Sequence, residues 1–199
     1  MSGPSKPVVL CIAGSPRRGG NSDRFLDALT DGVEAGGCTA VRLVASSAGV
    51  TPCRGCNSCS KAGVCVVRDG MDEVYAAIDS AHAIAISTPV FFATVPAVLK
   101  TLYDRFQPYW ARRYVLGEPA PQVRRPAALI VVGGGGDPYG MGCAITPTRS
   151  VLGPAGFELL EVLEIEGLDG PSAAATHPAE LERARALGTA LAEKTVART

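Results

Sequence analysis

The sequence lacks any excess of charge and any long apolar run. Its 199 residues carry 19 Lys and Arg against 19 Asp and Glu, so bulk charge attracts neither nucleic acid nor an anionic membrane. No segment approaches the roughly 20 apolar residues of a membrane span. The polar, proline-containing start lacks the layout of a signal peptide. We therefore expect a cytoplasmic protein with no nucleic-acid partner and no membrane partner.

The chain also has few groups for acid–base chemistry and no common nucleotide motif. Of its two histidines, His82 begins a predicted strand and His177 precedes a proline at a predicted helix start, so both are predicted to be structural. No Ser-His-Asp arrangement is present, and we assign no catalytic residue. The GxxxxGK(S/T) and GxGxxG patterns are both absent.

Two kinds of apolar pattern alternate along the chain. Short apolar runs predict strands over 8–14, 39–44, 82–87, 127–132 and 158–165. Helical spacing predicts helices over 21–35, 69–80, 96–106, 142–152 and 176–197, with Asn21 or Ser22, Asp69 and Thr176 as caps. There is no internal repeat and no linker. The alternation predicts a single α/β domain over 1–199, with helices on both faces of a five-stranded parallel sheet and a cysteine-rich loop at 46–68.

The loop after the first predicted strand has the residues of a phosphate cradle. In an open parallel sheet, ligands bind beyond the carboxyl ends of the strands. This loop opens a helix, whose first N–H groups are free to bind an anion. It also offers hydroxyl, amide and guanidinium donors, from Ser15, Arg17, Arg18, Asn21 and Ser22. The alternative is an ordinary turn before a capped helix.

Three loops together resemble one family. They are 14–22 (GSPRRGGNS), 87–96 (STPVFFATVP, followed by Leu99-Lys100 and Asp104-Arg105) and the glycines at 133–136. They are similar to the ligand-facing loops of the NADPH-dependent FMN reductase branch of flavodoxin-like proteins. The resemblance implies a three-layer, doubly wound flavodoxin-like sheet with strand order 2-1-3-4-5. It also implies FMN as cofactor and NAD(P)H as an electron donor.

The resemblance assigns roles to residues of all three loops. The FMN phosphate would be held by Ser15, Arg17, Asn21 and Ser22. The isoalloxazine ring would be lined by Pro89, Val90, Phe91 and Phe92, with Ala93 at the turn, and contacted from its other side by Gly133, Gly134, Gly135 and Gly136. Two positions depart from the family pattern, because Phe91 stands in place of a tyrosine and Ala93 in place of a glycine. For Phe91 and Phe92 the alternative is plain core packing.

Four of the seven cysteines lie within 13 residues. Cys53, Cys56, Cys59 and Cys65 are spaced C-x2-C-x2-C-x5-C, which is typical of 4Fe–4S ligation. Zinc, which prefers two separated CxxC pairs, and free thiols or disulfides are the alternatives. The loop is similar to that of the iron–sulfur flavoproteins. That resemblance implies that these cysteines ligate a cluster lying near the flavin of a neighbouring subunit.

The segment 104–125 holds further charged and aromatic side chains. Asp104 and Arg105 predict an exposed ion pair or a subunit contact. The connection 107–125 is predicted to be a packed surface loop, a lid, or a contribution to a partner's flavin pocket. It carries Tyr109, Trp110, Arg112, Arg113 and Tyr114.

Three functions are compatible with these features. The first is an iron–sulfur flavoprotein that passes electrons between a ferredoxin-like carrier or NAD(P)H and a small-molecule acceptor. The second is an NAD(P)H-dependent FMN or quinone reductase without a cluster. The third is a non-catalytic electron shuttle or redox sensor. The resemblance also implies a homodimer or homotetramer.

Overall fold

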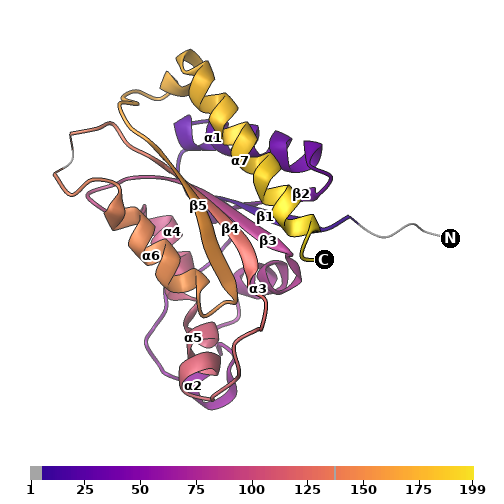
Figure 1. The fold of residues 1–199 in the computed structure, drawn as a ribbon. Coiled ribbons are helices and arrows are strands. Elements are labelled where there is room, and N and C mark those ends of the chain that lie inside the picture. The colour runs from indigo at the N-terminus through magenta and orange to yellow at the C-terminus, as the bar shows by residue number, and fades with distance from the viewer. Residues whose placement is uncertain (1–5, 137) are drawn as a thin grey trace.

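The sheet of the computed structural model, which describes residues 6–136 and 138–199, is all parallel. Its strands are β1 (Val8–Ala13), β2 (Thr39–Val44), β3 (Ala83–Pro89), β4 (Arg125–Val132) and β5 (Phe157–Ile165). Their order is β2-β1-β3-β4-β5 (Figure 1). The predicted flavodoxin-like α/β fold is therefore confirmed.

Helices cover both faces of this sheet (Figure 1). The helices are α1 (Asn21–Ala35), α2 (Cys59–Ala62), α3 (Met71–Ser80), α4 (Ala97–Asp104), α5 (Gln107–Tyr114), α6 (Gly142–Leu152) and α7 (Pro178–Val196), with 3-10 turns at Ala45–Ser47 and Ala173–Thr176. Of these, α2 and α5 pack against each other away from the sheet. One core lies between the sheet and α1 and α7, and the other lies between the sheet and α3, α4 and α6. Strands β1, β3 and β4 are buried on both faces, which explains their uninterrupted apolar sequences. Strand β2 is an outermost strand of the sheet, and none of its residues is fully buried.

Two predictions about helices in the second half of the chain are wrong. The predicted helix 96–106 ends at Asp104, and a further helix, α5, occupies the start of the connection that we expected to be a loop. Pro108 lies in the first turn of α5, where its missing N–H costs nothing. Thr176 does not cap α7, because it belongs to the preceding 3-10 turn, and His177 is the N-cap residue.

Because the strands are parallel, the carboxyl ends of β1, β3, β4 and β5 all lie at the same end of the sheet. The loops that follow these strands therefore meet there, as expected for the ligand side of an open α/β sheet. Among the described residues, no helix has the length and apolar character needed to cross a bilayer.

Candidate functional site

A cavity of about 170 Å³ opens at this end of the sheet. Nine of the predicted flavin-site residues line it: Ser15, Arg17, Asn21, Ser22, Pro89, Val90, Phe91, Gly133 and Gly134. The loops after β1, β3 and β4 thus contribute to one space. The segment after β5 contributes Leu168 and Gly170, which the sequence analysis missed, although the end of a fifth parallel strand was a signal for them.

The start of α1 has the free N–H groups expected of a phosphate-binding site. Its N-cap residue is Gly20, so neither Asn21 nor Ser22 caps the helix, and no side chain occupies the cap position. The Ser15 hydroxyl is instead an acceptor for the Arg17 N–H (3.0 Å), which shapes the turn before the helix. Because no side chain caps the helix, its first N–H groups can bind an anion.

Asn21 makes hydrogen bonds within the chain that the sequence analysis did not predict. Its amide nitrogen donates to the Gly170 carbonyl (2.9 Å), and its amide oxygen accepts from the Ala174 N–H (3.0 Å). The side chain therefore ties the segment after β5 to the start of α1. These hydrogen bonds hold this wall of the cavity in place, and the predicted contact of Asn21 with the phosphate stays a prediction.

The glycines after β4 line a second cavity of about 170 Å³. Gly133 and Gly134 border both cavities, as does Val90, so the two spaces adjoin. A Cβ atom at Gly134 would collide with the Asp169 carboxylate, and Gly135 and Gly136 have φ angles of +90° and +74°. A side chain at Gly134 would require Asp169 to move, and side chains at Gly135 and Gly136 would strain the backbone. The second cavity also has walls from Met141 and Glu166, which sequence reasoning missed.

A tight turn follows β3 and exposes the side chain of Phe92 beside the first cavity, which Phe91 lines. Phe91 and Thr94 exchange two backbone hydrogen bonds (2.8 and 3.1 Å), which closes a two-residue turn. Phe92 and Ala93 both adopt positive φ angles, +47° and +56°. Phe92 is fully exposed and Phe91 is 43% exposed, so plain core packing is excluded for both.

Ala93→Gly is expected to stabilise the protein by about 0.5–1 kcal/mol. Left-handed backbone costs an L-residue about 1–2 kcal/mol, which exceeds the roughly 0.4–1 kcal/mol that added glycine entropy costs in the unfolded state. Urea unfolding of the FMN-free protein measures the change. Ala186→Gly, on the exposed side of α7, is the matched control and should destabilise by about 1 kcal/mol. A destabilised Ala93→Gly variant would contradict the expectation.

These features fit FMN. The uncapped start of α1 lies beside the first of two adjoining cavities. The turn at Phe91 and the glycine backbone after β4 form walls of these cavities. A flat ring requires such apolar walls together with close backbone groups at its polar edge.

The four clustered cysteines border a separate cavity of about 320 Å³. Cys53, Cys56, Cys59 and Cys65 all line it, and it shares no lining residue with the two flavin-side cavities. Cys59 begins α2, and Gly63 in left-handed conformation ends it. Within residues 6–136 and 138–199, no three Cys, His, Asp or Glu side chains converge on one metal position. The thiols thus surround a space and do not close on a single ion.

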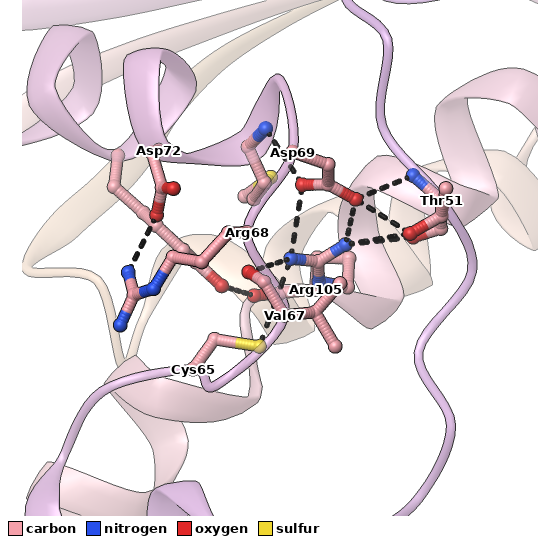
Figure 2. A network of polar contacts seen from close by, with 9 residues as sticks. Thr51, Cys65, Val67, Arg68, Asp69, Asp72 and Arg105 are labelled. Atoms are coloured by element: carbon pink, nitrogen blue, oxygen red, sulfur yellow. Dashed lines mark hydrogen bonds and ion pairs between the residues drawn. The ribbon is translucent and has the colours of Figure 1, made fainter.

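Arg105 anchors this cysteine loop to the domain. It is 1% exposed, and Figure 2 shows its guanidinium between Thr51 on one side and Val67 and Cys65 on the other. It pairs with Asp69 (2.7 and 3.2 Å) and donates to the Thr51 carbonyl (2.8 Å). It also reaches the Val67 carbonyl (3.3 Å) and Cys65 Sγ (3.6 Å). The exposed ion pair predicted for Asp104 and Arg105 is therefore wrong: Asp104 pairs with Lys100.

Comparison with known proteins decides the family. The family model for NADPH-dependent FMN reductase matches residues 7–153. The chain belongs to this family. Iron–sulfur flavoproteins from Archaeoglobus fulgidus and Methanosarcina thermophila are 34% and 35% identical over 64% and 47% of this chain. The matches cover 55% and 49% of those relatives, so the chain spans about half the length of the curated relatives it matches.

Solved structures agree on the fold of this FMN reductase family member. The NAD(P)H:quinone oxidoreductase from Methanothermobacter marburgensis superposes with a TM-score of 0.71 at 21% identity, over 94% of this chain and all of that one. A flavodoxin-like WrbA-like protein from Agrobacterium tumefaciens gives 0.61 at 14% identity, over 98% of this chain and all of that one.

The charge state of the Asp69–Arg105 pair follows from its contacts. Burial opposes ionisation of Asp69, but hydrogen bonds from Arg105 and Thr51 outweigh it and hold the pKa of this carboxyl well below its usual range. Burial likewise disfavours the Arg105 cation, and the Asp69 carboxylate raises the pKa of the guanidinium above its usual value. The pair is thus ionised at neutral pH beneath the cysteine loop.

The thiols of the loop differ in their surroundings. Partial burial, together with the neighbouring cysteine thiols, raises the pKa of Cys59. Hydrogen bonding from Ser58 lowers the pKa of the exposed Cys56. Helix α5 packs against α2, and Arg112 Nε donates to the Gly63 carbonyl (2.7 Å). In this family member the segment 107–125 therefore supports the cysteine loop and lines neither flavin-side cavity, while a contribution to a partner's flavin pocket stays a prediction.

Proposed function

We propose that this protein is an FMN-dependent oxidoreductase of the iron–sulfur flavoprotein kind. The observation that carries the proposal is the presence, on one chain of this family, of two adjoining cavities at the carboxyl ends of the strands and a separate four-cysteine cavity. FMN exchanges both single electrons and electron pairs, so it links a one-electron carrier to a two-electron donor or acceptor.

The residues of the first cavity would bind and orient the flavin. Arg17 and the first N–H groups of α1 would hold the phosphate, with Ser15 and Ser22 beside them. The turn at Phe91 and Phe92 and the glycine run would enclose the ring. Asn21 would fix the wall formed by the segment after β5, because its amide is already bonded there.

The four cysteines would ligate a 4Fe–4S cluster. Their spacing is typical of such ligation, and they surround a cavity of about 320 Å³ without closing on a point. Structural zinc sites usually draw their ligands from two separated CxxC pairs, and this chain offers one compact run of cysteines instead. The names of the curated relatives also favour iron–sulfur chemistry.

We further propose that a second copy of the chain completes the electron path. The cysteine cavity and the flavin-side cavities have separate linings within one chain. A homodimer or homotetramer would bring one chain's cysteine loop to another's flavin. Electrons would then pass between a ferredoxin-like carrier or NAD(P)H and a small-molecule acceptor.

Anaerobic purification tests the proposal. We expect bound flavin and about four iron atoms with equivalent acid-labile sulfide per chain. Flavin without iron would favour the second candidate, an NAD(P)H-dependent FMN or quinone reductase, which the structural likeness to a quinone oxidoreductase supports. Steady NAD(P)H oxidation with a quinone acceptor would then identify it. No turnover with any acceptor would leave a shuttle or sensor, and no FMN binding would overturn both candidates.

Arg17→Ala is expected to weaken FMN binding about tenfold to a hundredfold. Arg17 lines the phosphate-side cavity, and a charge-assisted hydrogen bond from its guanidinium would be worth about 1.5–3 kcal/mol. Flavin fluorescence quenching during titration of the FMN-free protein gives the Kd. Arg18→Ala is the matched control, because Arg18 bonds the Ser47 hydroxyl (3.1 Å) outside the cavity lining. Equal losses in the two variants would contradict the assignment.

A further inference from the structure

Arg105 is a buried cation in contact with a predicted cluster ligand. Its Nη2 lies 3.6 Å from Cys65 Sγ, within hydrogen-bond distance for sulfur. The side chain is 1% exposed and borders the cysteine cavity. Its Nε has no hydrogen-bond partner among residues 6–136 and 138–199. A guanidinium is thus held directly against the space that the four thiols enclose.

The rest of the network fixes this cation in place. Asp69 accepts from both terminal nitrogens of Arg105, and the Thr51 carbonyl accepts a third hydrogen bond (Figure 2). Asp69 is itself held by the Thr51 N–H and the Met71 N–H (2.9 and 3.0 Å). The guanidinium therefore cannot turn away from Cys65 without breaking a buried ion pair.

We propose that Arg105 is a positioning residue that raises the reduction potential of the iron–sulfur cluster through its hydrogen bond to Cys65 Sγ, and that Asp69 moderates this effect. The inference rests on the proposed function, since it requires the cluster. Reduction adds one electron, which a one-electron carrier supplies, and no bond forms or breaks and no proton moves.

The physical basis is electrostatic. Hydrogen bonds to ligand sulfurs, net charge and exposure set cluster potentials. A buried cation next to a sulfur ligand stabilises the more negative, reduced form, and little water screens it. Asp69 offsets part of this charge. Removing the cation should therefore lower the potential, and neutralising the carboxylate should raise it.

The alternative is a purely structural anchor for the loop. Arg112 provides the matched control, because it also bonds the loop, at the Gly63 carbonyl (2.7 Å), without any hydrogen bond to a cysteine sulfur among the described residues. An anchoring role predicts similar effects for Arg105 and Arg112. A tuning role predicts an effect for Arg105 alone, opposite in sign to that of Asp69.

The test is an anaerobic redox titration of the cluster, followed by its electron paramagnetic resonance signal. Arg105→Gln should shift the one-electron reduction equilibrium about tenfold toward the oxidised form, which is about 59 mV. Arg105→Lys, which keeps the charge, should shift it less. Asp69→Asn should shift it toward the reduced form, and Arg112→Gln should leave it within about twofold.

Each outcome bears on the proposal. Iron per chain is measured in every variant, so loss of the cluster is separated from a change in its potential. An Arg105→Gln protein with full iron and a wild-type potential would overturn the inference, as would shifts of the same sign in Arg105→Gln and Asp69→Asn. If Arg105→Gln does not retain iron, Arg105→Lys and Asp69→Asn still decide it. Absence of iron from the wild-type protein would refute the cluster itself, and the inference with it.

Discussion

Cys59→Ser is expected to reduce the iron content of the anaerobically purified protein from about four atoms per chain to fewer than about one, with FMN still bound. Cys59 starts α2 and borders the cysteine cavity together with the three other clustered cysteines. Serine oxygen is a poor ligand for a cluster that depends on soft thiolates. Iron, acid-labile sulfide and flavin assays on the same preparation measure the outcome.

Cys143→Ser is the matched control for this substitution. Cys143 is also partly buried, but it lies outside the cysteine cavity, and its thiol donates to the Gly140 carbonyl (3.1 Å), which serine can replace. Its iron content should equal that of the wild type. Full iron in Cys59→Ser would show that the four cysteines do not act together, and iron loss in both variants would point to general damage.

The fold was predictable wherever apolar periodicity alone determines an element. The predicted bounds of α1, β2 and α6 coincide with the observed ones, because each element has a clear buried face or alternation. Helix α5 escaped prediction because it is short and carries Arg112 and Arg113 in its last turn. Its buried face rests on few side chains, among them Tyr109 and Ala111, which is too little periodicity to distinguish a helix from a polar loop.

The flavin-side cavities were predictable because a parallel sheet brings strand ends together. The contacts of Asn21 were not, since its amide bonds Gly170 and Ala174, which lie 149 and 153 residues further along the chain. Sequence reasoning identified Asn21 as a donor at the start of α1, but the acceptor, the Gly170 carbonyl, is too distant in sequence to be predicted.

The network around Arg105 was unpredictable for the same reason. Arg105 joins Asp69 and Thr51, which are 36 and 54 residues away. Its adjacent acidic neighbour, Asp104, suggested a local pair. Arg105 pairs with Asp69 because a buried guanidinium requires a buried partner that offers several hydrogen bonds. Tertiary packing, which the sequence does not show, determines which residue that is.

Gly188→Ala is expected to destabilise the protein by about 1–2 kcal/mol. Helices α1 and α7 cross with their backbones in contact, and a Cβ atom at Gly188 would collide with the Leu29 carbonyl oxygen. Overpacking of this kind costs about 1–3 kcal/mol, occasionally more. Helix propensity acts in the opposite direction and favours alanine by about 1 kcal/mol. The colliding atom is backbone and cannot move aside as a side chain would, so the steric cost should prevail in urea unfolding of the FMN-free protein.

Gly153→Ala isolates the propensity contribution from the packing contribution. Gly153 ends α6 in right-handed helical conformation (φ −55°), and a Cβ atom there would lie 3.8 Å from the Arg149 carbonyl oxygen, an ordinary contact. This variant should be neutral or slightly more stable than the wild type. Because α1 also carries the phosphate-side helix start, the Gly188→Ala protein should bind FMN more weakly as α1 shifts. A Gly188→Ala protein as stable as Gly153→Ala would show that the two helices separate at little cost, and that their close crossing does not hold the cavity in shape.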